Sequence, residues 1–314
     1  MARGYDATNP EKSFDSDTCL LTGILARVPA RTVSSISKCY LNSGYQVLRK
    51  IGGGSYSQVK EVSQGQHRFA VKVIDTTRVS DDFKGRFLPR ELEILSRIDH
   101  RHIVNVLRIF KASEKVFIVM DLAEDGDLLC YIKKKKFLSD SRSRIYFLQI
   151  IDALNYLHGL DVAHRDLKCE NILMKSSRHV KLADFGFSRP CSKDGRRVLS
   201  RTFCGSTFYA SPEVLQGKAY NPKLYDVWSL GCILFIMLCG VMPFDDTDPK
   251  LQVKQQLCRN IAYPKTPVVS PEAKDLLRWM LEPDVLMRTS VPRILSHPWL
   301  SSKSGGDNNF LNSL

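Results

Sequence analysis

Two short segments constrain the fold of this chain more than any other part of its sequence. The first reads His-Arg-Asp-Leu-Lys-Cys-Glu-Asn over residues 164–171, and the second reads Asp-Phe-Gly over 184–186. They fix about eight residue identities at defined spacings; at ~1 in 20 per position, a chance match in a chain of this length is on the order of one in a million or less. The two segments supply two carboxylates, a lysine and an amide oxygen. Together they supply the groups that phosphoryl transfer needs from one side of a cleft.

The chain divides into regions that differ in composition and in the spacing of apolar residues. Residues 1–44 are rich in Ser and Thr, contain several Pro and Gly residues and show little periodicity. This composition predicts a mostly disordered extension, with a short helix around residues 20–28. From Tyr45 to Val73 apolar residues alternate between glycine-containing turns, a pattern typical of antiparallel strands. The polar residues 301–314 are predicted to form a flexible tail.

The order of the remaining elements predicts the fold class. A helix is predicted from Asp82 to Ile98 and is followed by two strands over 106–110 and 116–120. After Asp121 the texture becomes helical, because apolar residues recur at three-residue steps from Ile145 to Leu157. Further helices are predicted over 223–239, 249–259, 271–281 and 291–296. The sequence therefore predicts an α+β chain in which a small strand-rich lobe precedes a larger helical lobe.

Cysteine usage and apolar runs predict a cytoplasmic location, with the nucleus as a second location. The nine cysteines form no CxxC pair and no Cys/His spacing typical of a structural metal, so they are interpreted as free thiols in a reducing compartment. The N-terminus shows no secretion signal and no lipidation motif. The longest apolar run, Leu230 to Phe244, is too short to cross a bilayer and is interpreted as a buried core helix.

The formal net charge of +13 raises the hypothesis of a nucleic-acid or membrane partner. The densest basic cluster is the run of four lysines at 133–136. A solvated helix end is the preferred interpretation, because lysines also favour the negative pole of a helix and no aromatic residues interleave with them. The sequence therefore predicts no nucleic-acid partner and no membrane association.

The segments 164–171 and 184–186 resemble the catalytic motifs of the eukaryotic protein kinases, and this resemblance covers Tyr45 to Leu300. It implies the bilobal protein kinase fold. A small five-stranded antiparallel N-lobe with one main helix would span 45–121, and a larger, mainly helical C-lobe would span 122–300. The broad texture is similar to the calcium/calmodulin-dependent kinase group.

Several stretches look more similar to the testis-specific serine/threonine kinases. These stretches are 87–91, 126–129, 166–171, 202–206 and 242–246. This resemblance implies a role in sperm formation. The long extension before the first strand departs from the pattern of that family, whose members usually begin close to that strand.

The resemblance implies ATP and Mg²⁺ as ligands. The implied ATP-binding residues are Ile51, Gly52, Gly53, Gly54, Ser55, Tyr56, Ser57, Gln58, Val59, Ala70, Lys72, Glu91, Met120, Asp121, Ala123, Asp127, Glu170, Leu173 and Asp184. The run from Ile51 to Val59 resembles the glycine-rich loop whose backbone N–H groups close over phosphates, although Ser57 stands where the third glycine is usual. Lys72 would hold the α- and β-phosphates and pair with Glu91, with Glu93 as the competing candidate.

The same resemblance implies where the adenine would bind. Val59 and Ala70 would pack on the base from above, and Leu173 would pack on it from below. Backbone groups of Asp121 and Ala123 would bond to the edge of the base. Met120 would limit access behind it.

The resemblance also implies the catalytic roles. Asp166 is the expected catalytic base, Lys168 would neutralise charge on the transferring group, and Asn171 and Asp184 would hold Mg²⁺. His164 could be read as a general base, but a packing role is preferred. Lys168 points to Ser or Thr as the acceptor, and Ser206 agrees, because it occupies the small-hydroxyl position that faces the catalytic Asp in serine/threonine kinases.

Regulation and support of the site are also implied. Phosphorylation of Thr202, by an upstream kinase or by the chain itself, would order the activation loop through charge-assisted bonds from Arg165. Ser200 and Thr207 are the alternative phosphosites. Two buried contacts are expected elsewhere: an ion pair between Glu213 and Arg288, and bonds from Asp226 to the backbone of the catalytic loop.

The substrate class can be predicted from acidic residues near the implied cleft. Asp127 and Glu170 occupy positions that contact the ribose and an Arg three residues before the target in such kinases, which predicts protein substrates that are basic upstream of the acceptor Ser or Thr. Ile236 stands where strongly basic-directed relatives carry a further Glu, so selectivity for a second Arg is not expected. The alternative function is a catalytically weak pseudokinase that acts as a scaffold, which the unusual Ser57 leaves open.

Overall fold

The computed structural model describes residues 44–54, 57–202, 205–245 and 247–301. The extension predicted for 1–44, its short helix and the tail predicted for 301–314 therefore fall almost entirely outside the described residues. Ser55 and Tyr56 of the glycine-rich segment also lie outside them.

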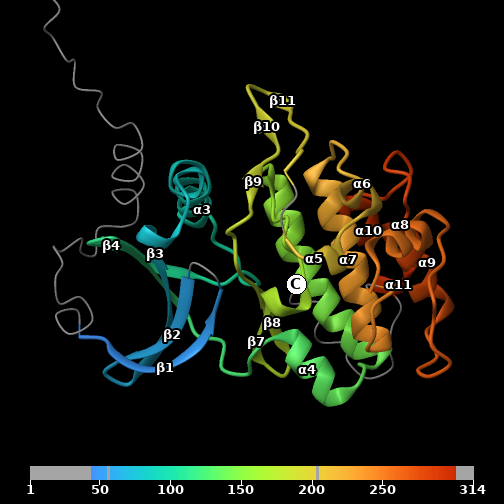
Figure 1. Ribbon diagram of the computed structural model, residues 1–314. Coiled ribbons are helices and arrows are strands. Elements are labelled where there is room, and N and C mark those ends of the chain that lie inside the picture. Colours follow the sequence, from blue (N-terminus) through green and yellow to red (C-terminus); the bar gives the residue numbers. More distant parts are fainter. Residues whose placement is uncertain (1–43, 55–56, 203–204, 246, 302–314) are drawn as a thin grey trace, which may run out of the picture.

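The N-lobe is built on one five-stranded antiparallel sheet (Figure 1). Its strands are β1 (Gln46–Gly53), β2 (Ser57–Gln64), β3 (His67–Asp75), β4 (Val106–Ala112) and β5 (Lys115–Asp121). Their order in the sheet is β1-β2-β3-β5-β4, and every neighbouring pair is antiparallel. The bilobal α+β fold expected from the sequence is therefore confirmed.

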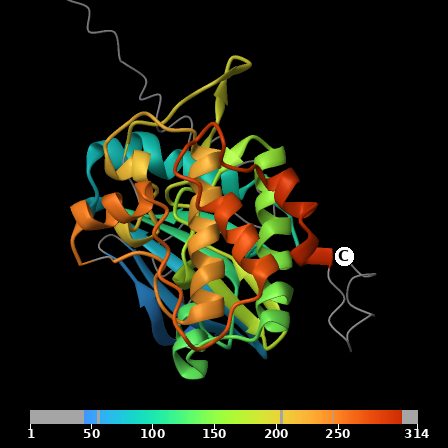
Figure 2. The same ribbon diagram turned by 90° about the vertical axis from the view of Figure 1, so that its right-hand side faces the viewer.

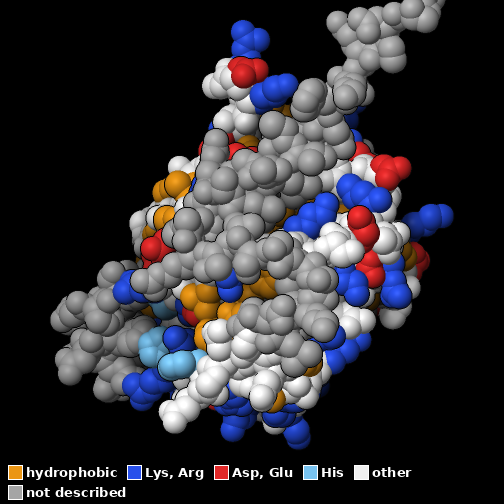
Figure 3. Space-filling view, turned by 90° about the vertical axis from the view of Figure 1, so that its left-hand side faces the viewer, with side chains coloured by type: hydrophobic (Ala, Val, Ile, Leu, Met, Phe, Trp, Pro, Cys, Tyr) orange, Lys and Arg blue, Asp and Glu red, His pale blue; other side chains and the backbone are white. Residues whose placement is uncertain are grey.

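Alternation along the strands places different side chains on the two faces of the sheet. On β5, Val116 and Ile118 join a hydrophobic cluster with Leu92 of the main N-lobe helix, whereas Phe117 and Val119 join a second cluster. Figure 3 views the molecule from this lobe and shows hydrophobic side chains in the middle of the face, with Lys and Arg side chains around them.

The main N-lobe helix begins about where expected but ends before Ile98, and its first part has a different geometry. A π-helical turn, η2 (Phe83–Phe87), precedes the α-helix α3 (Leu88–Leu95). Helical geometry runs without a break from Asp81 into α3, so Pro89 lies inside it. Because Pro89 has no N–H to donate, one hydrogen bond is missing there, and the π-helical turn precedes this point. The helix ends before Ile98 because the Ser96 hydroxyl donates to the Glu93 carbonyl, at 2.8 Å, which leaves that carbonyl less available to a further turn.

The C-lobe is mainly helical (Figures 1 and 2). Its α-helices are α4 (Leu128–Lys135), α5 (Asp140–Gly159), α6 (Pro212–Leu215), α7 (Pro222–Cys239), α8 (Pro249–Leu257), α9 (Pro271–Met280), α10 (Val291–Leu295) and α11 (Pro298–Ser301). Short strands lie between α5 and α6: β6 (Val162–Ala163), β7 (Ile172–Ser176), β8 (His179–Leu182), β9 (Arg189–Pro190), β10 (Ser192–Lys193) and β11 (Arg196–Arg197). The 3-10 turns are η1 (Thr76–Arg78) in the N-lobe and η3 (Cys169–Asn171) and η4 (Thr207–Tyr209) in the C-lobe.

Helix α7 forms the centre of the C-lobe. It is the one helix among the described residues that is long and apolar enough to cross a membrane, but 89% of its 18 residues are buried inside the protein. The interpretation of this apolar run as a core helix is therefore confirmed.

The lysine run falls at the end of α4, as expected. Lys133, Lys134 and Lys135 occupy the last turn of this helix and are exposed. There they lie at the negative pole of the helix dipole.

Candidate active site

A lysine and two carboxylates from distant segments meet between the two lobes. Lys72 on β3 places its Nζ 2.7 Å from Oε1 of Glu91 on α3 and 2.9 Å from Oδ1 of Asp184. Although burial opposes its charge, the carboxylates of Glu91 and Asp184 raise the pKa of Lys72. The competing candidate, Glu93, instead pairs with Arg97 at 2.7 Å. The structure therefore brings together the pair expected from the sequence, with Glu91 as the partner.

Asp184 is held in a conformation that few side chains adopt. Its φ angle is +62°, in the left-handed region. The nearby Lys72 ammonium lowers the pKa of Asp184, although partial burial opposes this effect. The carboxylate therefore remains charged, and 48% of the side chain is exposed.

Asp166 has two oxygens with different surroundings. Its Oδ2 accepts hydrogen bonds from Lys168 Nζ at 2.8 Å and from Asn171 Nδ2 at 2.9 Å. Its Oδ1 is buried and has no hydrogen-bond partner among the residues that the structure describes. One oxygen thus fixes the orientation of the carboxylate, and the other is available to a hydroxyl group.

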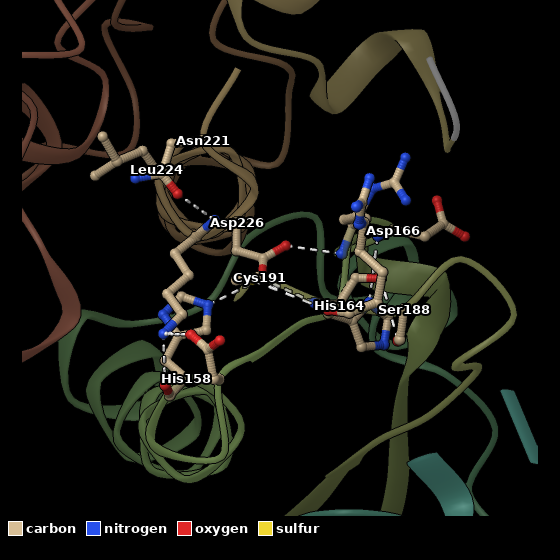
Figure 4. A network of polar contacts seen from close by, with 12 residues as sticks. His158, His164, Asp166, Ser188, Cys191, Asn221, Leu224 and Asp226 are labelled. Atoms are coloured by element: carbon tan, nitrogen blue, oxygen red, sulfur yellow. Dashed lines mark hydrogen bonds and ion pairs between the residues drawn. The ribbon is translucent and has the colours of Figure 1, made fainter. Parts of the chain in front are cut away.

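The backbone around Asp166 is held by a carboxylate from α7 (Figure 4). Arg165 has a φ of +67°, so this loop has an unusual backbone conformation. Asp226, which is fully buried, accepts the N–H of His164 at 2.9 Å and the N–H of Arg165 at 2.8 Å. It also lies 2.9 Å from Nε2 of His158. The expected contact between Asp226 and the catalytic loop is present.

His164 uses both of its ring nitrogens in structural hydrogen bonds. Nδ1 accepts the N–H of Asp166 at 3.3 Å, so the proton must lie on Nε2, which donates to the carbonyl of Ala183 at 3.0 Å. The ring is fully buried and meets Phe185 edge to face at 5.0 Å. This geometry agrees with a packing role and leaves no nitrogen to act as a base.

The residues expected around a nucleotide come from both lobes. In the sheet, Val59 lies opposite Lys72, and Ala70 lies opposite Met120. Below them, Leu173 on β7 forms a β-bridge with Asp127.

The other implied nucleotide residues have the following surroundings. Gly52 and Gly53 end β1, and the Gly54 N–H donates to the Ser57 carbonyl. Ile51 and Gln58 are exposed, whereas Asp121 and Ala123 are half-buried in the segment that joins the lobes. The Asp127 side chain caps α4 by accepting the N–H of Cys130 at 2.8 Å, and Glu170 accepts a hydrogen bond from the Tyr209 hydroxyl at 3.2 Å.

The oxygen donors at this site fit Mg²⁺. Asn171 Nδ2 donates hydrogen bonds to the carbonyl and the carboxylate of Asp166, so Asn171 Oδ1 is the atom left to bind a metal. Asp184 contributes a charged carboxylate. Over the described ranges of the chain, no three His, Cys, Asp or Glu side chains form a cluster that could hold a metal. Two oxygen ligands without a full protein cage suit Mg²⁺, which usually keeps water and phosphate oxygens as its other ligands.

The three candidate phosphosites differ in exposure. Ser200 is fully buried, and its backbone pairs with that of Tyr220. Its hydroxyl accepts a hydrogen bond from Arg189 Nη1 at 3.3 Å. Thr202 and Thr207 are exposed. The carbonyl of Thr202 accepts Arg165 Nη2 at 2.9 Å, so this residue lies beside the arginine expected to contact it.

Two further arginines near Thr202 were missed by the sequence analysis. The pKa of Arg90 on α3 is lowered by burial and by the positive charges of Arg189 and Arg165, so both of these arginines lie near Arg90. Arg90 makes no hydrogen bond or ion pair with any described residue. The available sequence signal was the position of Arg90 directly before Glu91. Such a cluster of like charges favours a bound anion.

Gly205 lies against the catalytic loop more closely than any other residue type could. A Cβ atom at this position would lie 2.9 Å from the carbonyl oxygen of Arg165 and 2.9 Å from Oδ1 of Asp166. Its φ is +88°, which also favours glycine. The neighbouring Ser206 was expected to face Asp166, but no hydrogen bond joins its hydroxyl to Asp166 among the described residues.

Substitution of Gly205 by Ala is expected to lower kcat by about 10²-fold, because the new methyl group must displace Asp166 or its loop. Gly217→Ala is the matched control: Gly217 has a φ of +69°, but no atom lies within 4 Å of its Cβ position. In both variants, alanine must adopt a left-handed backbone conformation, which costs ~1–2 kcal/mol. Steady-state kinetics and thermal melting of the two variants separate this shared cost from the clash. Equal kcat values would contradict the expected role of the close contact.

The region beyond the site is held by a buried ion pair that the sequence analysis expected. Arg288 donates to both carboxylate oxygens of Glu213, at 2.7 and 2.9 Å, and its guanidinium lies 4.9 Å from the centre of a Trp228 ring. Glu213 lies in the first turn of α6, shortly after the segment that contains Thr202 and Gly205. The pair therefore connects this segment to the end of the C-lobe.

Comparison with known proteins gives consistent matches. Residues 45–300 match the family model described as "Protein kinase domain". The chain is 47% identical over 268 residues to testis-specific serine/threonine-protein kinase 1 of Mus musculus, which covers 84% of this chain and 73% of that protein. It is 45% identical over 266 residues to testis-specific serine/threonine-protein kinase 3 of Homo sapiens, and the match covers 83% of this chain and 98% of that protein. NUAK family SNF1-like kinase 2 of Homo sapiens is 39% identical over 262 residues, and the match covers 83% of this chain and 41% of that protein.

Proposed function

This chain belongs to the protein kinase family and is a protein-serine/threonine kinase; from that premise we propose that Asp166 is its catalytic base. The observation that carries this proposal is the buried, unpartnered Oδ1 of Asp166. This oxygen accepts the hydrogen bond of a substrate Ser or Thr hydroxyl and takes its proton as the hydroxyl oxygen bonds to the γ-phosphorus of ATP. The bond from that phosphorus to ADP breaks in the same transfer.

The neighbouring side chains act on the same transfer. Lys168, 2.8 Å from Asp166, neutralises negative charge that develops on the phosphoryl group. Lys72 binds the α- and β-phosphates and is oriented by Glu91. Asn171 Oδ1 and the Asp184 carboxylate would hold Mg²⁺, which when bound neutralises charge on the phosphate oxygens.

The test of this function is ATP-dependent phosphate transfer by the purified chain to a Ser peptide in the presence of Mg²⁺. Turnover in the usual range of ~1–100 s⁻¹ is expected. Removal of Mg²⁺ by a chelator is expected to stop transfer, and addition of Mg²⁺ in excess should restore it. Transfer that persists without any divalent cation would contradict the roles given to Asn171 and Asp184.

The kinase is activated, we further propose, by phosphorylation of Thr202. This threonine is exposed, its carbonyl accepts a hydrogen bond from Arg165, and Arg90 lies near both Arg165 and Arg189. A phosphate on Thr202 would accept charge-assisted hydrogen bonds from these arginines and relieve their mutual repulsion. Because Arg165 precedes Asp166 and Arg90 precedes Glu91, the phosphate would stabilise both halves of the active site.

Thr202→Ala is expected to lower kcat/KM by about 10–100-fold relative to the phosphorylated wild type, the value of one charge-assisted hydrogen bond of ~1.5–3 kcal/mol. The control is Thr207→Ala, which removes the other exposed hydroxyl of this segment and should leave activation by phosphorylation intact. Mass spectrometry of the active protein should locate phosphate on Thr202.

Arg90→Ala supplies an independent test, because it removes a phosphate ligand while keeping Thr202. Phosphatase treatment should then change the activity of the Arg90→Ala variant much less than that of the wild type. Full activation of this variant by phosphorylation would exclude Arg90 from the phosphate site.

For the biological setting we propose phosphorylation of basic protein substrates in the cytoplasm of male germ cells, with the nucleus as a second location. Several relatives are testis-specific kinases by name, which supports the cell type. The exposed carboxylate of Glu170 supports binding of a basic residue before the target. A peptide library without enrichment of Arg or Lys before the acceptor would remove the basic preference, and detection of the protein chiefly in other tissues would remove the germ-cell role.

A further inference from the structure

Helix α8 buries two of its glutamine side chains and exposes both of its leucine side chains. Gln252 and Gln256 are only 2% and 1% exposed, whereas Leu251 and Leu257 are 38% and 45% exposed. The two glutamines are four residues apart, so they lie on the same face of the helix. Burial of an amide costs free energy unless the amide is hydrogen-bonded. A helix packed only for stability would direct its leucines inward, so the glutamines indicate a more specific role.

Both glutamines donate to one short turn beside the catalytic loop. Gln252 Nε2 donates to the carbonyl of Thr207 at 3.2 Å, and Gln256 Nε2 donates to the carbonyl of Ala210 at 3.0 Å. Between these two carbonyls, that of Tyr209 accepts the hydroxyl of Ser229 on α7 at 3.0 Å. Three carbonyls of the turn Thr207–Ala210 are therefore held by side chains from two helices.

The opposite side of this turn contacts the catalytic loop. The Tyr209 hydroxyl donates to Glu170 at 3.2 Å and accepts the N–H of Cys169 at 3.3 Å. The turn also begins two residues after Gly205, which lies against Asp166. Within it, Phe208 stays 46% exposed although its neighbours are fixed. The turn thus presents an apolar surface at a defined place relative to the catalytic aspartate.

We propose that Gln252 and Gln256 are positioning residues for the protein substrate, an inference that rests on the kinase function proposed above. By fixing the turn Thr207–Ala210, they keep the surface around Phe208 in place for the part of the substrate that adjoins its acceptor hydroxyl. They contact neither ATP nor the reacting atoms. Their loss therefore weakens binding of the protein substrate and leaves binding of ATP unchanged.

The first test replaces both glutamines by Met, which has a similar length but cannot donate a hydrogen bond. Loss of the two bonds is expected to raise the KM for a Ser peptide by about 10-fold. The KM for ATP should stay within about 2-fold of the wild-type value, since no ATP contact changes. The matched control is Lys254→Met, at an exposed position of the same helix.

The second test uses Gln256→Glu to separate positioning from simple packing. An ionised carboxylate cannot donate to the Ala210 carbonyl, whereas a protonated carboxyl group can. Burial raises the pKa of a carboxyl group, so the introduced side chain should become protonated as the pH falls from 8 to 6. The ratio of the variant's peptide KM to that of the wild type should therefore fall over this range. A packing defect would give a ratio that does not depend on pH.

The assays are run at a temperature below the thermal melting transition of every variant. If the double Met variant melts too low for this, the single Met variants replace it. Wild-type values for the peptide KM, a parallel rise of the ATP and peptide KM, or a pH-independent ratio for Gln256→Glu would each overturn the positioning role. Absence of phosphate transfer by the wild type would instead refute the proposed function.

Discussion

Replacement of Asp166 by Asn is expected to lower kcat by about 10³-fold, within the 10²–10⁴-fold range that general acid–base groups contribute. The amide has nearly the same shape as the carboxylate, so the loop should keep its fold. An amide cannot take the proton of the substrate hydroxyl, however, and it lacks the charge that Lys168 pairs with at 2.8 Å. The measurement is steady-state phosphate transfer to a Ser peptide by the wild type and the variant at saturating ATP.

Two controls make this result specific to catalysis. Asp81→Asn removes a carboxylate whose side chain is fully exposed, and it should leave kcat unchanged. The ATP dissociation constant of Asp166→Asn should stay close to that of the wild type, because Lys72 and the sheet residues remain. Equally weak transfer by wild type and variant, with Thr202 already phosphorylated, would instead favour the pseudokinase alternative.

Replacement of Arg288 by Ala is expected to lower the free energy of unfolding by about 3–5 kcal/mol, the usual cost of removing one partner from a buried ion pair. Glu213 would keep its buried position but lose both of its hydrogen bonds to the guanidinium. The contact between Arg288 and the Trp228 ring would be lost as well. For a domain of this size the expected drop in Tm is roughly 6–20 °C, which differential scanning calorimetry can measure.

An exposed ion pair supplies the comparison for this result. Arg259 pairs with Glu282 at the protein surface, and Arg259→Ala should shift Tm much less. Combining Arg288→Met with Glu213→Leu removes both charges and should recover part of the lost stability, since no buried charge is left unpaired. If Arg288→Ala shifts Tm no more than Arg259→Ala does, the buried pair does not carry the stability assigned to it.

The pairs that sequence analysis located correctly were those attached to recognisable motifs. The partners Lys72 and Glu91, and Glu213 and Arg288, are far apart in the chain, and no periodicity connects them. Their pairing followed from the resemblance to protein kinases, and the hydrogen bonds between them agree with it. The fold class followed from the order of strand-like and helix-like segments, which hydrophobic spacing alone reveals.

Other features depend on tertiary contacts that no local pattern reports. Ser200 and Thr202 were both candidate phosphosites in the sequence, but Ser200 is buried where its backbone pairs with Tyr220, whereas Thr202 is exposed. Leucine side chains are buried more often than glutamine side chains, but in α8 Gln252 and Gln256 are buried, because they donate to carbonyls of the neighbouring turn. Burial of such polar groups is decided by their partners, which lie some 45 residues away in the chain.

The contact between Asp226 and the catalytic loop has a consequence for synthesis of the chain. A ribosome completes Asp166, Lys168, Asn171 and Asp184 before it reaches Asp226. Until that carboxylate arrives, no side chain accepts the N–H groups of His164 and Arg165, and the left-handed backbone at Arg165 is unsupported. An incomplete chain therefore carries every reactive group without their working arrangement. We therefore expect no phosphate transfer by the growing chain before helix α7 has been made and packed.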